Sequence, residues 1–237
     1  MQKNEQYLRE NSYPGRGIVL GATPSGNALV QVYRIMGRSE NSRNRVFVET
    51  NEGVKTEAFD PSKMTDPSLV IYYVTRTVGE EHIVTNGDQT DTIADALKNG
   101  GSFETALLTR CYEPDAPNCT PRISGMTNAK TGAYSLSILK TIGNNESREE
   151  KAFFTYKAPV KGVGHCIHTY DGDGAPLPSF SGQPYEVELC ETARENAEKF
   201  WSMLNTDNRV SLLAKHIDRA TGKTEIVIIN RHGGEEK

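Results

Sequence analysis

Apolar and polar residues alternate near both ends of the chain, and this two-residue period predicts β-strands. Residues 17–20 form a short apolar run and residues 28–35 alternate, with Pro24 and Gly26 as turn residues between them. This pattern indicates a β-hairpin. The same pattern predicts two more hairpins, one from residues 69–78 and 82–85 and a terminal one from residues 209–218 and 224–230.

Three segments have apolar residues three or four positions apart, which is the spacing of amphipathic helices. Residues 90–97 and 103–111 are the first two, and they follow each other closely. Thr192 and Glu195 form a capping box at the start of the third helix. Its apolar stripe contains Trp201, the only tryptophan of the chain, which we expect in the core.

The remaining apolar runs complete an α+β pattern. Residues 144–150 and 171–182 are polar and are expected to be long surface loops. Strands, two helices, strands, one helix and strands follow one another, and this order predicts an α+β fold with antiparallel sheets. We expect one domain over residues 13–237, preceded by a polar extension of residues 1–12. Further strands are predicted at residues 123–126, 135–139, 152–156 and 163–169.

Composition and charge exclude several classes of protein. The 237 residues include 27 Lys and Arg against 31 Asp and Glu, a net charge of -4, which argues against general nucleic-acid binding. No apolar run is long enough to span a membrane, and no apolar leader is present, so we expect a cytoplasmic protein. The four cysteines lack zinc-site spacing and are expected to be reduced. An anionic small molecule would therefore need a local basic cluster.

One such cluster lies in residues 34–45, which contain four arginines and one glutamate. The planar guanidinium group of arginine matches phosphate oxygens with two hydrogen bonds, and serine hydroxyls add donors. A solvated basic loop explains the same composition. The candidate anion-binding residues are Arg34, Arg38, Ser39 and Arg43.

A second polar stretch surrounds the first two predicted helices. Its amide, hydroxyl and carboxylate groups precede a helix N-terminus and suit a ribose or an anion, although helix capping explains them equally well. Glu113 follows at the end of the second helix, where it can move protons beside a cation. The candidate residues of this stretch are Asn86, Gly87, Thr90, Asp91, Thr92, Thr120 and Arg122.

At these residues the sequence resembles the archaeal-type IMP cyclohydrolase family. The most specific match is the segment Asn-Gly-x-x-Thr-Asp-Thr-Ile-Ala-Asp at residues 86–95. Supporting matches are the Tyr-Pro-Gly-Arg of residues 13–16, the Tyr-Arg and Arg-Ser-x-x-x-Arg of residues 33–43, Tyr112-Glu113 and the Thr-Pro-Arg-Ile of residues 120–123. The extension of residues 1–12 and the 171–182 loop depart from the family pattern.

The resemblance implies a four-layer α/β/β/α sandwich like that of the N-terminal-nucleophile hydrolases, without their N-terminal nucleophile. It also implies closure of 5-formamidoimidazole-4-carboxamide ribonucleotide to IMP, without a metal or organic cofactor, by a homo-oligomer. Glu113 would then act as base or proton shuttle. Tyr72 would donate a hydrogen bond from its hydroxyl to the formyl oxygen, and Arg38 would contact phosphate or an oxyanion.

Two other functions remain open from the sequence. An amidohydrolase on the same fold could use an internal thiol such as Cys166 as its nucleophile. A nucleotide-binding module could hold IMP on the same residues without catalysing a reaction. The fold alone does not separate these functions, because chemistry depends on the site.

Overall fold

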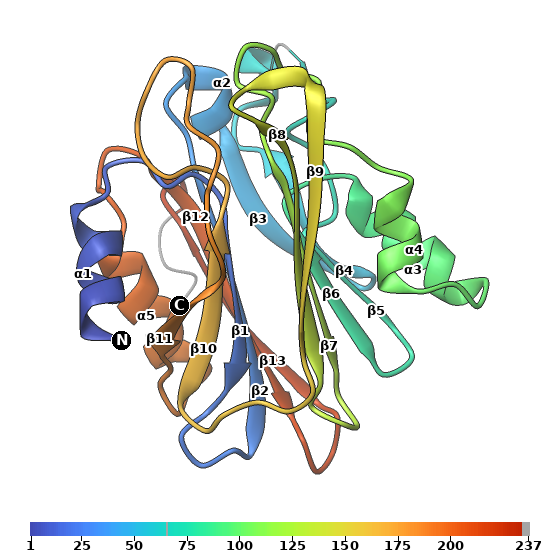
Figure 1. Cartoon of the computed structure of the whole chain (residues 1–237). Helices are drawn as coiled ribbons and strands as arrows, with labels where there is room; N and C mark the ends of the chain where they lie inside the picture. Colours follow the sequence, from blue (N-terminus) through green and yellow to red (C-terminus); the bar gives the residue numbers. More distant parts are fainter. Residues whose placement is uncertain (65, 234–237) are drawn as a thin grey trace.

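Two antiparallel sheets form the centre of the molecule, in the computed structural model that describes residues 1–64 and 66–233 (Figure 1). The first sheet has six strands in the order β11-β10-β1-β2-β12-β13. These are β1 (Gly17–Ala22), β2 (Ala28–Met36), β10 (Val163–His168), β11 (Tyr185–Glu188), β12 (Arg209–Asp218) and β13 (Thr224–Asn230). The α+β class with antiparallel sheets is thus confirmed.

The second sheet has five strands in the order β5-β6-β7-β8-β9. These are β5 (Thr75–Val78), β6 (Glu81–Thr85), β7 (Arg122–Asn128), β8 (Tyr134–Ile142) and β9 (Asn145–Tyr156). A separate two-stranded hairpin of β3 (Arg45–Thr50) and β4 (Gly53–Ala58) contacts both sheets, with β3 against β12 and β13 and β4 against β5. The sequence pattern did not predict this hairpin.

Helices cover the outer faces of the sheets on opposite sides of the molecule (Figure 1). α1 (Gln2–Glu10) and α5 (Ala193–Met203) lie on the first sheet, and α3 (Gln89–Lys98) and α4 (Phe103–Leu108) lie on the second. The short helix α2 (Glu40–Arg43) and the 3-10 turn Pro61–Lys63 connect strands. Among residues 1–64 and 66–233, no helix has the length and apolar character required to cross a membrane.

Three apolar clusters correspond to the three interfaces between these layers. Side chains such as Ile18, Tyr33 and Leu136 fill the space between the sheets. A second cluster joins the first sheet to α1 and α5, and a third joins the second sheet to α3 and α4. Because strand residues alternate between faces, strands such as β2 and β6 supply one cluster from each face.

Sequence signals set the starts of the helices. Ser102 and Thr192 each accept a hydrogen bond from the backbone three residues later, and the reciprocal bond of a capping box is present at both. Such a cap stabilises a helix by about 1 kcal/mol. α4 ends at Leu108, before the predicted end at residue 111, so Glu113 lies in a loop and not at a helix end.

Three other local expectations were wrong. Residues 145–150 continue the edge strand β9 and are not a loop, because Gly143 and Asn144 adopt positive φ and make a tight turn. Residues 69–74 are not a strand, and β5 begins at Thr75. Trp201 is only partly buried and packs against the rim of the core, with the guanidinium carbon of Arg209 4.5 Å from the centre of its ring.

The polar extension of residues 1–12 contains α1, which packs on the first sheet. Leu8 is buried there at 1% exposure, and the side-chain amide of Asn4 donates to the backbone oxygen of Glu186 on β11. Lys199 on α5 forms an ion pair with Glu5 at 2.8 Å. The extension is therefore an ordered part of the outer helical layer.

Candidate active site

A group of buried arginine and tyrosine side chains gathers at the end of the sheets where β1, β3 and β7 begin and where β2 and β10 end. This arginine–tyrosine cluster takes residues from six separate chain segments, and antiparallel pairing places those strand ends together. Its members are Arg16, Tyr33, Arg45, Tyr72, Glu113, Arg122 and Tyr170.

Glu113 is the carboxylate of the cluster. Its side chain is 2% exposed, and its Oε2 accepts a hydrogen bond from Nη1 of Arg16 at 3.3 Å. The backbone of the loop is fixed because Glu113 N–H donates to the carbonyl of Thr120 at 2.9 Å. Among residues 1–64 and 66–233, Oε1 has no hydrogen-bond partner, so one carboxylate oxygen is free to accept a proton.

Two tyrosine hydroxyls meet beside Arg45. The hydroxyls of Tyr33 on β2 and Tyr72 before β5 are 2.9 Å apart. Arg45, the first residue of β3, is 1% exposed and donates from Nε to the carbonyl of Ser42, whereas its Nη1 has no partner in the part of the chain that the structure describes. A guanidinium donor and two hydroxyls therefore lie near one another between the sheets.

Arg122 and Tyr170 connect the cluster to the loop of residues 113–120. Nη1 of Arg122 donates to Oδ1 of Asp88 at 2.7 Å and to Oε1 of Gln89 at 2.8 Å. No described residue gives its buried Nε a partner. The hydroxyl of Tyr170 hydrogen-bonds to Oγ1 of Thr120. The positions of both side chains are therefore set by neighbouring groups.

The cluster contains three guanidinium groups and one carboxylate. Four of its side chains have a buried atom with no hydrogen-bond partner among the described residues, and a buried charge without partners is unfavourable. An anionic molecule with several oxygen atoms would both balance the charge and accept these N–H groups. The unpartnered atoms are Nε of Arg16, Nη1 of Arg45, Oε1 of Glu113 and Nε of Arg122.

The surroundings alter how these groups bind protons. Burial raises the pKa of the Glu113 carboxyl, although Arg16 and Arg122 act in the opposite direction. This change moves a carboxyl toward the range in which it can both accept and release a proton near neutral pH. Burial, with Tyr72 adding to it, raises the pKa of Tyr33 well above its ordinary value, so that hydroxyl stays protonated.

Several candidates from residues 86–92 have their hydrogen-bonding groups used within the protein. Oδ1 of Asn86 accepts from the N–H of Ile123 at 2.8 Å, and its Nδ2 donates to the carbonyl of Pro121. Thr90 donates to the carbonyl of Gly87 at 3.1 Å. A Cβ on Gly87 would lie 2.6 Å from Nη1 of Arg122, so this glycine leaves room for that guanidinium.

Two candidates on α3, one carboxylate and one hydroxyl, contact arginines that are not members of the cluster. Asp91 forms an ion pair with Nε of Arg76 at 2.6 Å. Thr92 accepts a hydrogen bond from Nη1 of Arg110 at 3.2 Å. The segment therefore holds α3 and β7 in place and brings Arg122 into the cluster.

The arginine-rich segment of residues 34–45 divides into separate environments. Arg43 donates to the carbonyl of Gly37 and to Asn208 at 2.9 Å. Ser39 is the N-cap of α2. Arg34 is buried at 1% exposure on the helix-covered outer face of the first sheet.

Arg38 lies at the rim of the cluster. Its half-exposed guanidinium donates to Asp173 and to the carbonyl of Gly174, and lies 5.1 Å from the centre of the Tyr13 ring. It thus ties the 171–182 loop to the segment before β1. This solvent-facing position suits contact with a ligand that enters from outside.

The structure adds members of the cluster that the sequence did not single out as site residues. Arg16 and Tyr33 stand inside motifs that resemble the family, and Arg45 ends the arginine-rich segment, so a signal existed for each. Tyr170 has no sequence signal. It reaches the cluster because β10 pairs with β1, so that His168 lies beside Gly17.

Comparison with known proteins places the chain in a family. The sequence model described as "IMP cyclohydrolase-like protein" matches residues 13–222. A protein named IMP cyclohydrolase from Methanopyrus kandleri is 33% identical over 175 residues, covering 70% of this chain and 79% of its own length. One of the same name from Methanococcus aeolicus is 32% identical, covering 67% and 74%. Another, from Methanothrix thermoacetophila, is 29% identical, covering 76% and 92%.

Proposed function

The chain belongs to the IMP cyclohydrolase-like family, and we propose that it closes the purine ring of 5-formamidoimidazole-4-carboxamide ribonucleotide to give IMP and water. The observation that carries this proposal is the arginine–tyrosine cluster. It places a buried carboxylate with one free oxygen beside unpartnered guanidinium N–H groups and paired tyrosine hydroxyls. These are the groups that the reaction requires.

The reaction joins two groups of one substrate molecule. The carboxamide nitrogen attacks the formyl carbon and loses a proton, while the formyl oxygen gains one. The resulting carbinolamine then loses its hydroxyl group and the proton of the formamido nitrogen as water, which leaves a C=N bond in the new ring. Because both groups are on one ring, the enzyme mainly has to hold the reactive rotamer and move protons. No oxidation state changes, so side chains can carry every step.

Glu113 is the proposed proton shuttle. Its free Oε1 can accept the proton of the attacking nitrogen and pass it to the formyl oxygen, and can then accept the proton of the formamido nitrogen and pass it to the departing hydroxyl, which leaves as water. The ion pair with Arg16 holds the carboxyl in position through the other oxygen. Burial raises its pKa, which strengthens it as a base when ionised and keeps it within range for returning the proton.

Tyr72 is the proposed donor to the formyl oxygen. Tyr33, buried behind it, can orient the Tyr72 hydroxyl through the bond at 2.9 Å. Arg45 adds positive charge next to this pair, which stabilises negative charge that develops on the formyl oxygen. Tyr72 and Arg45 thus act on the same atom from the interior of the cluster.

The remaining positive groups are proposed to bind the ribonucleotide. Arg122 has a free Nε inside the cluster, and Arg38 stands at the solvent-facing rim, so we assign phosphate and oxyanion contacts to these two. Thr120 and Gly87, from the polar stretch around the first two predicted helices, are proposed to help position these arginines. We assign positioning roles to the other sequence candidates, namely Arg34, Ser39, Arg43, Asn86, Thr90, Asp91 and Thr92.

The layered arrangement supports a finer statement about the fold. We propose that the two sheets with helices outside them are a four-layer α/β/β/α sandwich of the N-terminal-nucleophile hydrolase type. On the family resemblance we also propose a cytoplasmic homo-oligomer. Size-exclusion chromatography with light scattering would give the mass of that assembly.

The other two functions fit the structure less well. Cys166 is 0% exposed on the outer face of the first sheet, with its thiol next to the Tyr185 hydroxyl, so it does not reach the cluster. An amidohydrolase that uses this thiol is therefore disfavoured. A binding module without chemistry would not need a buried, partly unpaired carboxylate.

The test is a turnover measurement by ultraviolet absorbance with the formamido ribonucleotide, followed by chromatographic identification of IMP. We expect catalysed IMP formation that a thiol-alkylating reagent does not abolish. Absence of turnover by folded protein that still binds IMP would instead establish the binding module.

A further inference from the structure

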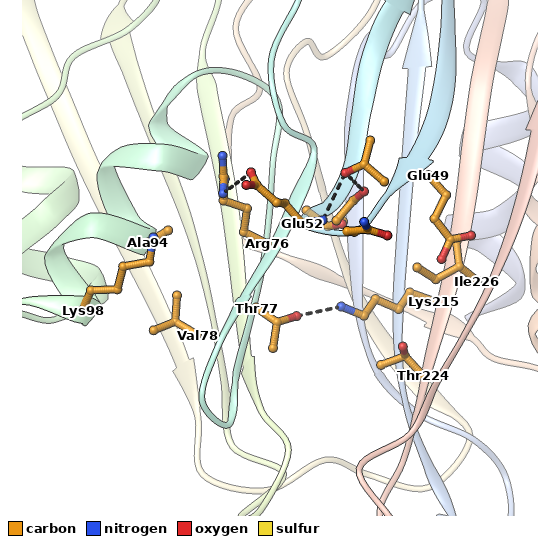
Figure 2. Close-up of a pocket in the computed structure, with 14 residues that line it drawn as sticks. Glu49, Glu52, Arg76, Thr77, Val78, Ala94, Lys98, Lys215, Thr224 and Ile226 are labelled. Carbon is orange, nitrogen blue, oxygen red and sulfur yellow. Dashed lines mark hydrogen bonds and ion pairs between the residues drawn. The ribbon is translucent and has the colours of Figure 1, made fainter.

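A polar cavity lies away from the arginine–tyrosine cluster, at the side of the molecule. Its volume is about 430 Å³, and it lies between the β3–β4 hairpin, β5, α3 and strands β12 and β13 (Figure 2). Ligand-binding cavities usually begin at about 300 Å³. None of the seven cluster residues is among the described residues that line it. The proposed reaction therefore does not use this cavity.

Lys215 supplies the buried cation of this cavity. Its side chain belongs to β12, is 4% exposed as a residue, and extends into the cavity toward Thr77 (Figure 2). Nζ donates to Oγ1 of Thr77 at 3.3 Å, and that hydroxyl lies 3.3 Å from Nδ1 of His82. A protonated lysine has three N–H donors. Two of them have no acceptor within the described part of the chain.

The other cations that line the cavity already have carboxylate partners. Arg76 pairs with Glu52 at 3.0 Å and with Asp91, and Lys98 pairs with Asp95 at 3.6 Å. Lys215 has no such partner within 4.0 Å among the residues that the structure describes. Burial lowers its pKa to about 8, and Glu49 on β3 opposes this change. A buried ammonium group thus faces a space large enough for a ligand.

We propose that this cavity is a second ligand site, in which Lys215 binds the phosphate or carboxylate group of a small metabolite. An oxyanion beside Nζ accepts the two free N–H donors and lies closer to the ammonium group than Glu49, which acts on Lys215 only from beyond ion-pair distance. The hydroxyl of Thr77 holds the ammonium group toward the cavity. His82 adds no charge at neutral pH, because burial and then Lys215 lower its pKa to about 4.

The site makes a distinctive prediction about pH. Binding requires the protonated amine, so affinity falls once the pH passes the pKa of Lys215 in the free protein. Four other charged groups line this cavity beside Lys215. They are Glu49 of β3, Glu52 of the hairpin turn, Arg76 of β5 and Lys98 of α3.

Isothermal titration calorimetry with sulfate and with acetate tests the proposal, because the charges of both ions are constant over this pH range. We expect wild-type protein to bind at least one of them about tenfold more tightly at pH 6.5 than at pH 9.5. Tighter binding of sulfate than of acetate would indicate a metabolite that bears a phosphate group. Tighter binding of acetate would indicate one that bears a carboxylate. Lys215→Met should lose this binding while keeping turnover, and the exposed control Lys157→Met should keep both.

Two results would overturn the proposal. One is wild-type protein that binds neither ion at pH 6.5, a result that needs no variant. The other is Lys215→Met that binds as wild type does, which would place the anion in the arginine–tyrosine cluster. Because the readout is binding and not turnover, failure here is distinct from failure of the proposed reaction.

Discussion

The hydroxyl oxygens of Tyr33 and Tyr72 lie 2.9 Å apart in the interior, although 39 positions separate the two residues in the chain. Tyr33 is fully buried, whereas Tyr72 is 6% exposed and lies nearer the solvent. Burial and Tyr72 raise the pKa of Tyr33, so the inner hydroxyl remains a hydrogen-bond donor. This difference in exposure supports the proposal that Tyr72 contacts the substrate and that Tyr33 orients Tyr72.

The tyrosine pair predicts unequal effects of two matched substitutions. Tyr72→Phe removes the proposed donor to the formyl oxygen and should lower kcat about 100-fold, as loss of one oxyanion donor does. Tyr33→Phe removes only the orienting bond and should lower kcat about tenfold or less. Steady-state kinetics of both variants provide the comparison. A larger loss for Tyr33→Phe would reverse the assigned roles.

Arg45 and Arg38 differ in depth, and this difference predicts different kinetic effects. Arg45→Met removes buried positive charge next to Tyr72 and should lower kcat by about 100-fold. Arg38→Met removes a half-exposed guanidinium at the rim and should mainly raise KM. Circular dichroism would verify that both variants fold. An unchanged kcat for folded Arg45→Met would remove Arg45 from the chemical step.

Buried neutral histidines predict loss of stability in acid. Burial lowers the pKa of His168 to about 3 and of His82 to about 4, while an unfolded histidine titrates near 6.5. Between these values the unfolded chain binds more protons, so the free energy of unfolding falls as the pH decreases below about 6.5. Each residue contributes on the order of 3 kcal/mol of this loss by pH 4.

Denaturant unfolding at pH 7 and pH 4 checks the histidine prediction. His82→Gln should lose less stability between the two pH values than wild-type protein does, because it lacks one of the groups that titrate. Replacement of His232, which is only partly buried, provides the control and should follow wild type. Equal losses for His82→Gln and wild type would contradict the prediction.

Lys215 predicts a stability change at the alkaline end. Its pKa of about 8 lies below the ordinary value of 10.5, so the unfolded chain binds more protons between these values and stability rises with pH across that window. Lys215→Met avoids the buried charge and should raise the free energy of unfolding at pH 7 by up to about 3 kcal/mol. The advantage should shrink toward pH 10.5. A variant less stable than wild type at pH 7 would contradict this.

Local sequence signals predicted the framework well. The capping residues Ser102 and Thr192 begin helices, and the terminal hairpin has the predicted bounds. Local sequence signals failed where tertiary contacts determine the position of a side chain or a hairpin. Trp201 packs at the rim of the core beneath Arg209, and the β3–β4 hairpin is held by contacts with the two other sheets.

The candidate site was only partly accessible from sequence. Glu113, Tyr72 and Arg122 were selected and lie in the cluster, because family-like motifs marked them. Arg45 was counted in the arginine-rich segment but was not selected as a candidate, since only the packing of β3 shows that it is buried. Tyr170 depends on strand pairing between distant segments, which composition and spacing do not encode.

Glu113→Gln, compared with Glu146→Gln, tests the central claim most directly. Glu146 is exposed on β9, so its substitution controls for loss of one negative charge. Single-turnover IMP formation should fall about 10²- to 10⁴-fold for Glu113→Gln and stay near wild type for Glu146→Gln. Wild-type single-turnover rates for folded Glu113→Gln at every pH would show that the cluster does not move protons through this carboxylate.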